Sequence, residues 1–165
     1  MEFLLLGPVE VRDARRRVPA GGPQAEKALA LLLLAAGRAV PVEELVEALW
    51  DGRPPRTATH QVHKIVGGLR GRFPGLIVTD GRAYRLRLGP HTLDVDRFSA
   101  LTERPEIPGL VAALALWRGP ALAGLDGRAL RAAAAALDDR RRALLARLAA
   151  AGTGLGSTVD PGWAG

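Results

Sequence analysis

The sequence predicts an α+β fold in the first half of the chain and an all-α fold in the second half. Short runs that alternate apolar and polar residues lie near Met1 and again before Leu88, and segments with helical periodicity lie between them. Beyond Leu93 the periodicity is helical. Hydrophobic residues make up 48% of the chain but aromatic residues only 4%, so we expect an aliphatic core.

The N-terminal elements follow one another in a definite order. "EFLLLGPVEVR" predicts a strand, a Gly-Pro break and a second strand, and a third short extended piece follows in "RRRVPAGGP". Pro23 suits the first turn of a helix, which we expect to run to about Ala36 and to end at Gly37. "VPVEELVEALW" predicts a second helix with Pro41 near its start, and "DGRPPR" predicts a loop.

A third helix is expected to begin near Thr57 and to include "THQVHKIVGGLRGRF". "LIVTDGRAYRLRL", from Leu76 to Leu88, contains two alternating runs about a glycine-containing turn, which predicts a hairpin. Three helices followed by a basic hairpin form the plan of a winged helix-turn-helix. In that plan the third helix enters the major groove of DNA and the hairpin, or wing, contacts the backbone or the minor groove.

The positive charge is concentrated in the middle of the chain. The formal net charge is +6, and residues 53–87 contain eight Lys and Arg residues but a single acid, Asp80. Such a segment favours an anionic partner.

The third helix separates into two faces at about 100° per residue. Val62, Val66, Leu69 and Phe73 form an apolar stripe. The opposite side and its flanks carry hydrogen-bond donors, glycines and no acid: Thr57, His60, Gln61, His63, Lys64, Gly67, Gly68, Arg70, Gly71 and Arg72. Each glycine costs the helix about 1 kcal/mol relative to alanine. We interpret the glycines as allowing close approach to DNA with reduced reading of the bases.

DNA binding is one of several functions that such a helix could serve. A zinc site would need His60, His63 and a third ligand, but the helix has no carboxylate, the chain has no cysteine, and His91 is the one remaining histidine. A solvated surface without a partner is the plainer alternative. Two serines, no cysteine and no Walker-type loop argue against an enzyme, and no cofactor is indicated.

The second half ends in an Ala-rich helix expected from about Gly127 to Ala151. Leu130, Leu137 and Leu144 lie one heptad apart in it. This stripe predicts a face packed on the preceding helix, with self-association as the alternative. "DDRRR" is typical of a solvated face, and a second DNA contact is the alternative.

Taken together, these stretches resemble the Streptomyces antibiotic regulatory proteins. The resemblance lies in "FLLLGPVEVR", "GGPQAEKALALLLLAAGRAVPVEELVEALWDGRPPRTA", "QVHKIVGGLR", "IVTDGRAYRLRL", "LDVDRFSAL" and "ALALWRGPALAGL". It implies an OmpR-type winged-helix DNA-binding domain at 1–92 and a shortened, TPR-like bacterial transcriptional activation domain at 93–151. We expect residues 152–165 to be a disordered tail.

The resemblance also implies a function and its residues. It implies a sequence-specific activator of a secondary-metabolite gene cluster that binds double-stranded DNA at direct repeats, contacts RNA polymerase holoenzyme and allows a homodimer on DNA. The residues placed at DNA are Thr57, Thr59, His60, Gln61, His63, Lys64, Gly67, Arg70, Arg72 and, from the wing, Arg82 and Arg85. The loop with Asp51, Arg53 and Arg56 would face the polymerase.

Two departures from the family keep an alternative open. Gly67-Gly68 replaces the usual serine and longer residue, and the helical hairpin before "ALALWRGP" is shortened. The alternative is a truncated regulator that binds DNA weakly and acts as an interaction module or antagonist of a full-length relative. The longest apolar run, Ala28 to Ala36, is short for a membrane span, and the N-terminus lacks a basic signal region, so we expect no membrane association and a cytoplasmic location.

Overall fold

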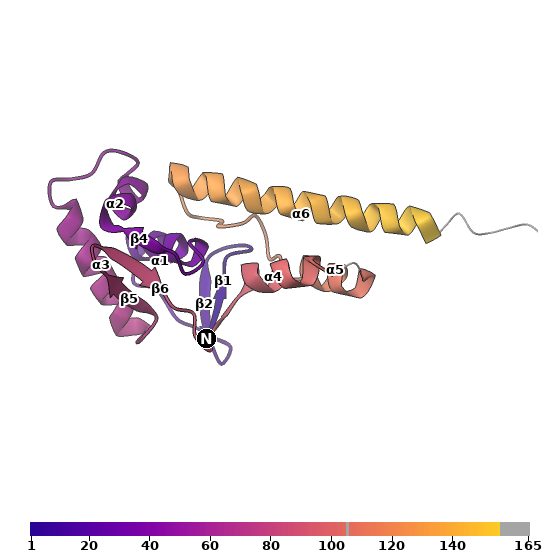
Figure 1. The fold of residues 1–165 in the computed structure, drawn as a ribbon, viewed down its shortest axis with the longest axis horizontal. Helices are drawn as coiled ribbons and strands as arrows, with labels where there is room; N and C mark the ends of the chain where they lie inside the picture. The colour runs from indigo at the N-terminus through magenta and orange to yellow at the C-terminus, as the bar shows by residue number, and fades with distance from the viewer. Residues whose placement is uncertain (105, 156–165) are drawn as a thin grey trace, which may run out of the picture.

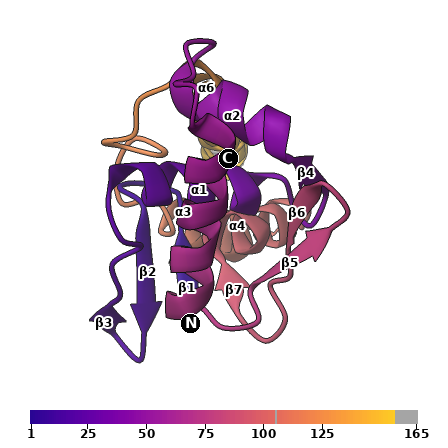
Figure 2. The ribbon, with the colours of Figure 1, turned by 90° about the vertical axis from the view of Figure 1, so that its left-hand side faces the viewer.

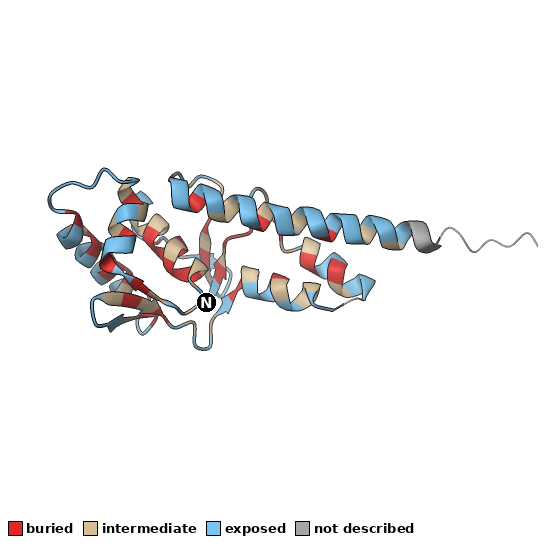
Figure 3. Cartoon of the chain, turned by 45° about the horizontal axis from the view of Figure 1, so that its top comes forward, coloured by how far each residue is buried: buried red, intermediate tan, exposed pale blue. Residues whose placement is uncertain are grey.

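The computed structural model describes residues 1–104 and 106–155, with an α/β body from which a helical arm extends (Figure 1). Most of the outer surface of the long C-terminal helix is exposed (Figure 3). Within the described ranges, no helix is both long enough and apolar enough to cross a membrane.

The first sheet joins the N-terminus to the start of the helical arm. It contains β1 (Glu2–Leu4), β2 (Glu10–Asp13), β3 (Arg16–Arg17) and β7 (Thr92–Leu93), in the order β3-β2-β1-β7. β1 pairs antiparallel with β2 and parallel with β7. The three N-terminal strands were predicted. β7 was not, because two residues are too short to show a period.

The three helices of the body lie close to their predicted bounds: α1 (Pro23–Leu34), α2 (Val42–Trp50) and α3 (Ala58–Arg72). The predicted hairpin forms from β5 (Ile77–Asp80) and β6 (Ala83–Leu86). An unpredicted strand, β4 (Ala39–Pro41), pairs with β6, and its last residue, Pro41, is also the N-cap of α2, near the helix start as predicted. The predicted order β-β-β-α-α-α-β-β therefore needs one strand inserted after α1 and another after the hairpin.

The helical arm consists of α4 (Asp94–Thr102), α5 (Ile107–Leu114) and α6 (Arg128–Leu155). Leu137 and Leu144 of α6 pack with Phe98 of α4 and Leu110 of α5, which confirms the packed apolar stripe. α6 runs past Ala151, where its end was expected, and residues 156–165 of the expected tail lie outside the described residues.

The body and the arm share their packing. Leu122 and Leu130 of the second half belong to the same core as Phe3, Leu29 and Leu69 of the first half. Buried apolar area of this kind is the main stabilising contribution in a folded domain. The arm is therefore seated on the body by apolar contact.

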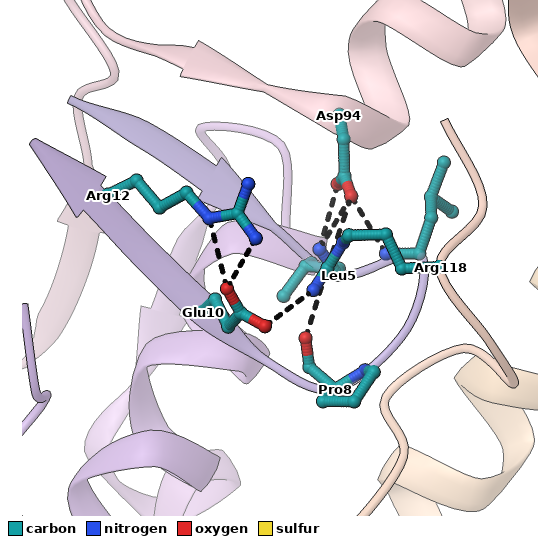
Figure 4. Close-up of polar contacts among 7 residues, drawn as sticks. Leu5, Pro8, Glu10, Arg12, Asp94 and Arg118 are labelled. Atoms are coloured by element: carbon teal, nitrogen blue, oxygen red, sulfur yellow. Dashed lines mark hydrogen bonds and ion pairs between the residues drawn. The ribbon is translucent and has the colours of Figure 1, made fainter. Parts of the chain in front are cut away.

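A buried carboxylate stands at the joint between the body and the arm (Figure 4). Asp94, 2% exposed, accepts hydrogen bonds from the backbone N–H groups of Leu5 (2.8 and 2.9 Å) and Leu6 (2.9 Å). Arg118 lies 4.0 Å from Asp94 and donates to Glu10 (2.9 Å) and to the carbonyl oxygen of Pro8 (2.8 Å). Burial raises the pKa of the Asp94 carboxyl group, and the hydrogen bonds from Leu5 and Leu6 oppose that rise.

Candidate nucleic-acid interface

Helix α3 crosses one end of the molecule with its polar side turned outward. Figure 2 shows it on the face toward the viewer, with the β5–β6 hairpin beside it. Val62, Val66 and Leu69 are buried, as the apolar stripe predicted. The outer ridge of α3, which we define as His60, Lys64, Gly67 and Gly71, is exposed along its length. The prediction that the polar side of this helix faces solvent is confirmed.

The glycines of the outer ridge are not required by the packing of the chain. A Cβ atom built on Gly67 or Gly71 would meet nothing within 4 Å, and neither residue has a positive φ. Alanine would fit at both positions and would favour the helix by about 1 kcal/mol each. The fold therefore gives no reason for these glycines, whereas a partner that approaches the helix backbone closely would.

A cleft separates α3 from the hairpin. This wing cleft has a volume of about 350 Å³ and is lined by Thr59 and His63 of α3, by Val42 at the start of α2, and by residues 79 and 81–84 of the hairpin. The His63 ring meets the Tyr84 ring edge to face at 6.3 Å. Hydroxyl, imidazole and guanidinium groups thus line one depression, and all three can donate hydrogen bonds to a phosphate.

Arg70 has a role that the sequence did not indicate. Its guanidinium donates to the carbonyl oxygen of Ile77 (3.0 Å) and to Oγ1 of Thr79 (2.7 Å), and it lies over the Tyr84 ring at 5.4 Å. These contacts hold α3 against the hairpin. Arg70 was expected on the flank facing DNA, but its guanidinium is engaged within the protein.

The two arginines of the wing lie in different places. Arg82, at the exposed hairpin tip, lines the wing cleft and forms an ion pair with Glu43 at 2.9 Å. Arg85 donates to the carbonyl oxygen of Gly37 (3.0 Å) and pairs with Asp80. Successive side chains of a strand point to opposite faces. Tyr84 packs against α3 through its contacts with His63 and Arg70, so alternation puts Arg85 on the opposite face of β6, and a DNA contact by Arg85 stays a prediction.

Some of the remaining predicted residues in and before α3 are exposed, and others form hydrogen bonds within the protein. Thr59, His60, His63 and Lys64 are exposed, and no ion pair involves Lys64 in the part of the chain that the structure describes. The Gln61 side-chain amide donates to Oγ1 of Thr57 at 2.9 Å, so these two side chains contact each other.

The loop before α3 has two exposed arginines, but its first residue is bonded to α6. Arg53 and Arg56 are exposed. Asp51 has a left-handed backbone (φ 50°), and its Oδ1 accepts a hydrogen bond from the backbone N–H of Arg128 at 2.8 Å. Arg128 also pairs with Glu47 at 3.0 Å. Asp51, expected to face the polymerase, therefore caps the first turn of α6.

No group of three or more metal-ligating side chains that could hold a metal ion occurs in residues 1–104 and 106–155. Thr79 lines the wing cleft although it was not among the predicted site residues. A single threonine in an alternating strand carries no sequence signal of that position.

Comparisons with known proteins show what this chain is similar to. Residues 93–160 match the family described as the bacterial transcriptional activator domain. The chain is 33% identical to the transcriptional regulatory protein MoaR1 of Mycobacterium tuberculosis, over 76% of this chain and 46% of the relative. It is 32% identical to the transcriptional regulator RedD of Streptomyces coelicolor, over 92% of this chain and 49% of the relative.

Among solved structures, the chain is similar to Mycobacterium tuberculosis EmbR in complex with a low-affinity phosphopeptide. The TM-score is 0.83 at 31% identity, over 94% of this chain and 46% of that chain. The chain thus spans about half the length of the relatives it matches. Its residues 93–160 are similar to the bacterial transcriptional activator domain and follow a mixed α/β part, and its relatives support the resemblance to the Streptomyces antibiotic regulatory proteins. MoaR1 and RedD, both curated relatives, are named as transcriptional regulators.

Proposed function

We propose that this protein is a DNA-binding transcriptional regulator that lays the outer ridge of α3 in the major groove. His60 and Lys64 would donate hydrogen bonds to DNA, and Gly67 and Gly71 would let the helix backbone approach the groove. The wing cleft would hold the phosphate backbone beside the helix. The observation that carries this proposal is an exposed, acid-free helix face on which Gly67 and Gly71 have open space where a Cβ atom would lie.

The target genes, the operator and the polymerase contact are proposed from the resemblance and from the exposed loop residues Arg53 and Arg56. The regulator would act as an activator of a secondary-metabolite gene cluster in the cytoplasm. It would bind direct repeats, with two copies on one operator. The exposed guanidinium groups of Arg53 and Arg56 would be available to RNA polymerase.

The direct experiment is a salt titration of binding to a fluorescein-labelled duplex of mixed sequence, followed by anisotropy. Each neutralised phosphate contributes about 0.9 to the slope of log K against log salt. We expect a steep slope for the wild-type protein, and a shallower slope with weaker binding for Lys64→Ala. Arg97→Ala, which removes an exposed arginine of α4, is the control of equal charge.

Two outcomes of the salt titration would contradict the proposed function or favour its alternative. Binding that does not respond to salt, or equal losses for Lys64→Ala and Arg97→Ala, would contradict DNA recognition by α3. No binding at all by a folded wild-type protein would favour the alternative of an interaction module or antagonist.

A further inference from the structure

A second cleft lies on the other flank of α3. It has a volume of about 400 Å³ and is lined by Ala20–Ala25, at the start of α1, and by Lys64, Ile65, Gly68 and Arg72 of α3. We call it the α1 cleft. It shares no lining residue with the wing cleft, and Lys64 is the one residue of its lining that has a role in the function proposed above.

The two clefts lie on opposite sides of the outer ridge. At about 100° per residue, Thr59 and His63 project to one flank of α3, and Gly68 and Arg72 project to the other. The major groove is about 12 Å wide and is bordered by a phosphate strand on each side. A helix seated in it therefore needs two places for backbone, one on each flank.

The rim of the α1 cleft is cationic. Neither Lys64 nor Arg72 forms an ion pair within the described residues. Arg72 donates through Nη1 to the carbonyl oxygen of Gly68 at 3.3 Å. A Cβ atom on Gly21, which has φ +118°, would lie 2.9 Å from Cζ of Arg72, so the glycine leaves room for this guanidinium. Two unpaired cations, one of them held in place, border the same depression.

The walls of the cleft are apolar, formed by Pro23, Ala25 and Ile65. Pro23 has no N–H group, the N–H groups of Gln24 and Ala25 have no acceptor within the helix, and Gly22 supplies no side-chain cap. Cations and free N–H groups suit a phosphate, while an apolar wall suits the deoxyribose that joins successive phosphates. This combination fits a strand of DNA backbone better than a small hydrated anion.

We infer that the α1 cleft binds the sugar-phosphate backbone of the DNA strand that borders α3 on the side away from the wing. Lys64 and Arg72 contact its phosphates there, and Pro23, Ala25 and Ile65 pack against its deoxyribose. The inference rests on the proposed function, because it requires α3 to lie in the major groove. It adds a second backbone contact, made by the start of α1 together with α3.

The test uses two variants of the full chain in the salt titration against a mixed-sequence duplex. Arg72→Ala removes the held cation, and we expect the slope to fall by about 0.9 with several-fold weaker binding. Gln24→Glu places a carboxylate in the cleft. A negative charge in the first turn favours a helix, so we expect weaker DNA binding without loss of thermal stability. Arg97→Ala is again the control of equal charge, and thermal unfolding of each variant confirms that it folds.

The outcomes separate this inference from the proposed function. If the wild-type protein binds DNA and Lys64→Ala weakens it, but Arg72→Ala and Gln24→Glu match Arg97→Ala, the cleft contact is overturned and the major-groove placement stands. If inorganic phosphate at constant ionic strength raises the melting temperature of the wild type but not of Arg72→Ala, the cleft is a small-anion site and the backbone contact is overturned. No such rise, together with both losses of DNA affinity, supports it.

Discussion

Individual residues of α3 serve the fold and the surface in different ways, and the glycines of its outer ridge show this most clearly. Gly67 and Gly71 weaken the helix and fill no tight space in the protein. Residues that lower stability without helping the packing are expected where a surface is used by a partner.

Replacing Gly67 with alanine separates stability from DNA binding. We expect Gly67→Ala to raise the free energy of unfolding by roughly 0.5–1 kcal/mol, because alanine favours the helix. We also expect it to weaken DNA binding several-fold, because the methyl group occupies the surface that approaches the groove. Urea unfolding and anisotropy measure the two effects.

A matched control exists in α6. Gly152 is also an exposed glycine of a helix, with nothing within 4 Å of an added Cβ. Gly152→Ala should raise stability by an equal or smaller amount and leave DNA binding unchanged. Unchanged DNA binding by Gly67→Ala would remove this account of the glycines.

The sequence predicted which residues of α3 are exposed better than it predicted what their side chains contact. Helical periodicity placed His60 and Lys64 outside and Val62 and Val66 inside, because one period decides the whole face. It could not assign Arg70 or Arg85. An arginine on a flank or a strand is held by whichever carbonyl or carboxylate the tertiary structure brings within reach, here those of Ile77, Gly37 and Asp80.

At the scale of elements, α6 is tied to the end of α2. The carboxylate of Asp51 accepts a hydrogen bond from the N–H of Arg128 in the first turn of α6. Gly127, which has φ +116°, lies close to the same carboxylate. The loop that leads into α3 is thus anchored at its first residue to the longest helix of the arm.

Removing this cap should loosen α6 from the body. We expect Asp51→Ala to lower the free energy of unfolding by about 1 kcal/mol, since it removes an N-terminal cap and places alanine at positive φ. Asp51→Asn keeps an acceptor oxygen and tolerates that backbone, so it should stay near the wild type. Urea unfolding of both variants is the measurement, and equal stability of all three proteins would show that the contact stabilises nothing.

The missed elements share a physical cause. β4 and β7 are three and two residues long, too short for an alternating pattern, and each exists because a longer strand pairs with it. Helices α1, α2, α3 and α6 were predicted because each spans at least two helical periods. The α1 cleft could not be predicted at all, because α1 and α3 meet there only in the folded protein.

At the scale of the whole molecule, the joint between body and arm depends on Asp94. Asp94 is the first residue of α4, and its carboxylate accepts hydrogen bonds from the two residues that follow β1. Arg118 links it to Glu10 and Pro8. Because burial raises the pKa of Asp94, the folded protein holds this proton more tightly than the unfolded chain does.

The contribution of Asp94 to the stability of the protein therefore depends on pH. As pH rises from the ordinary pKa of an aspartic acid to the raised value, the unfolded chain ionises first, so the contribution of Asp94 to stability falls across that window. Asp94→Asn cannot titrate, so its stability relative to the wild type should increase over the same window. Urea unfolding of both proteins at a series of pH values tests this, and a constant difference between the two curves would contradict it.

The central claim is that the outer ridge of α3, with the clefts on its two flanks, is the surface that meets DNA. The most direct measurement is the change in backbone amide chemical shifts of the labelled protein when a mixed-sequence duplex is added. We predict that the largest changes lie at His60, Lys64, Gly67 and Gly71, at the hairpin tip and at the start of α1, with little change along α5 and the outer face of α6. Shifts concentrated on the helical arm, with α3 unaffected, would contradict the account.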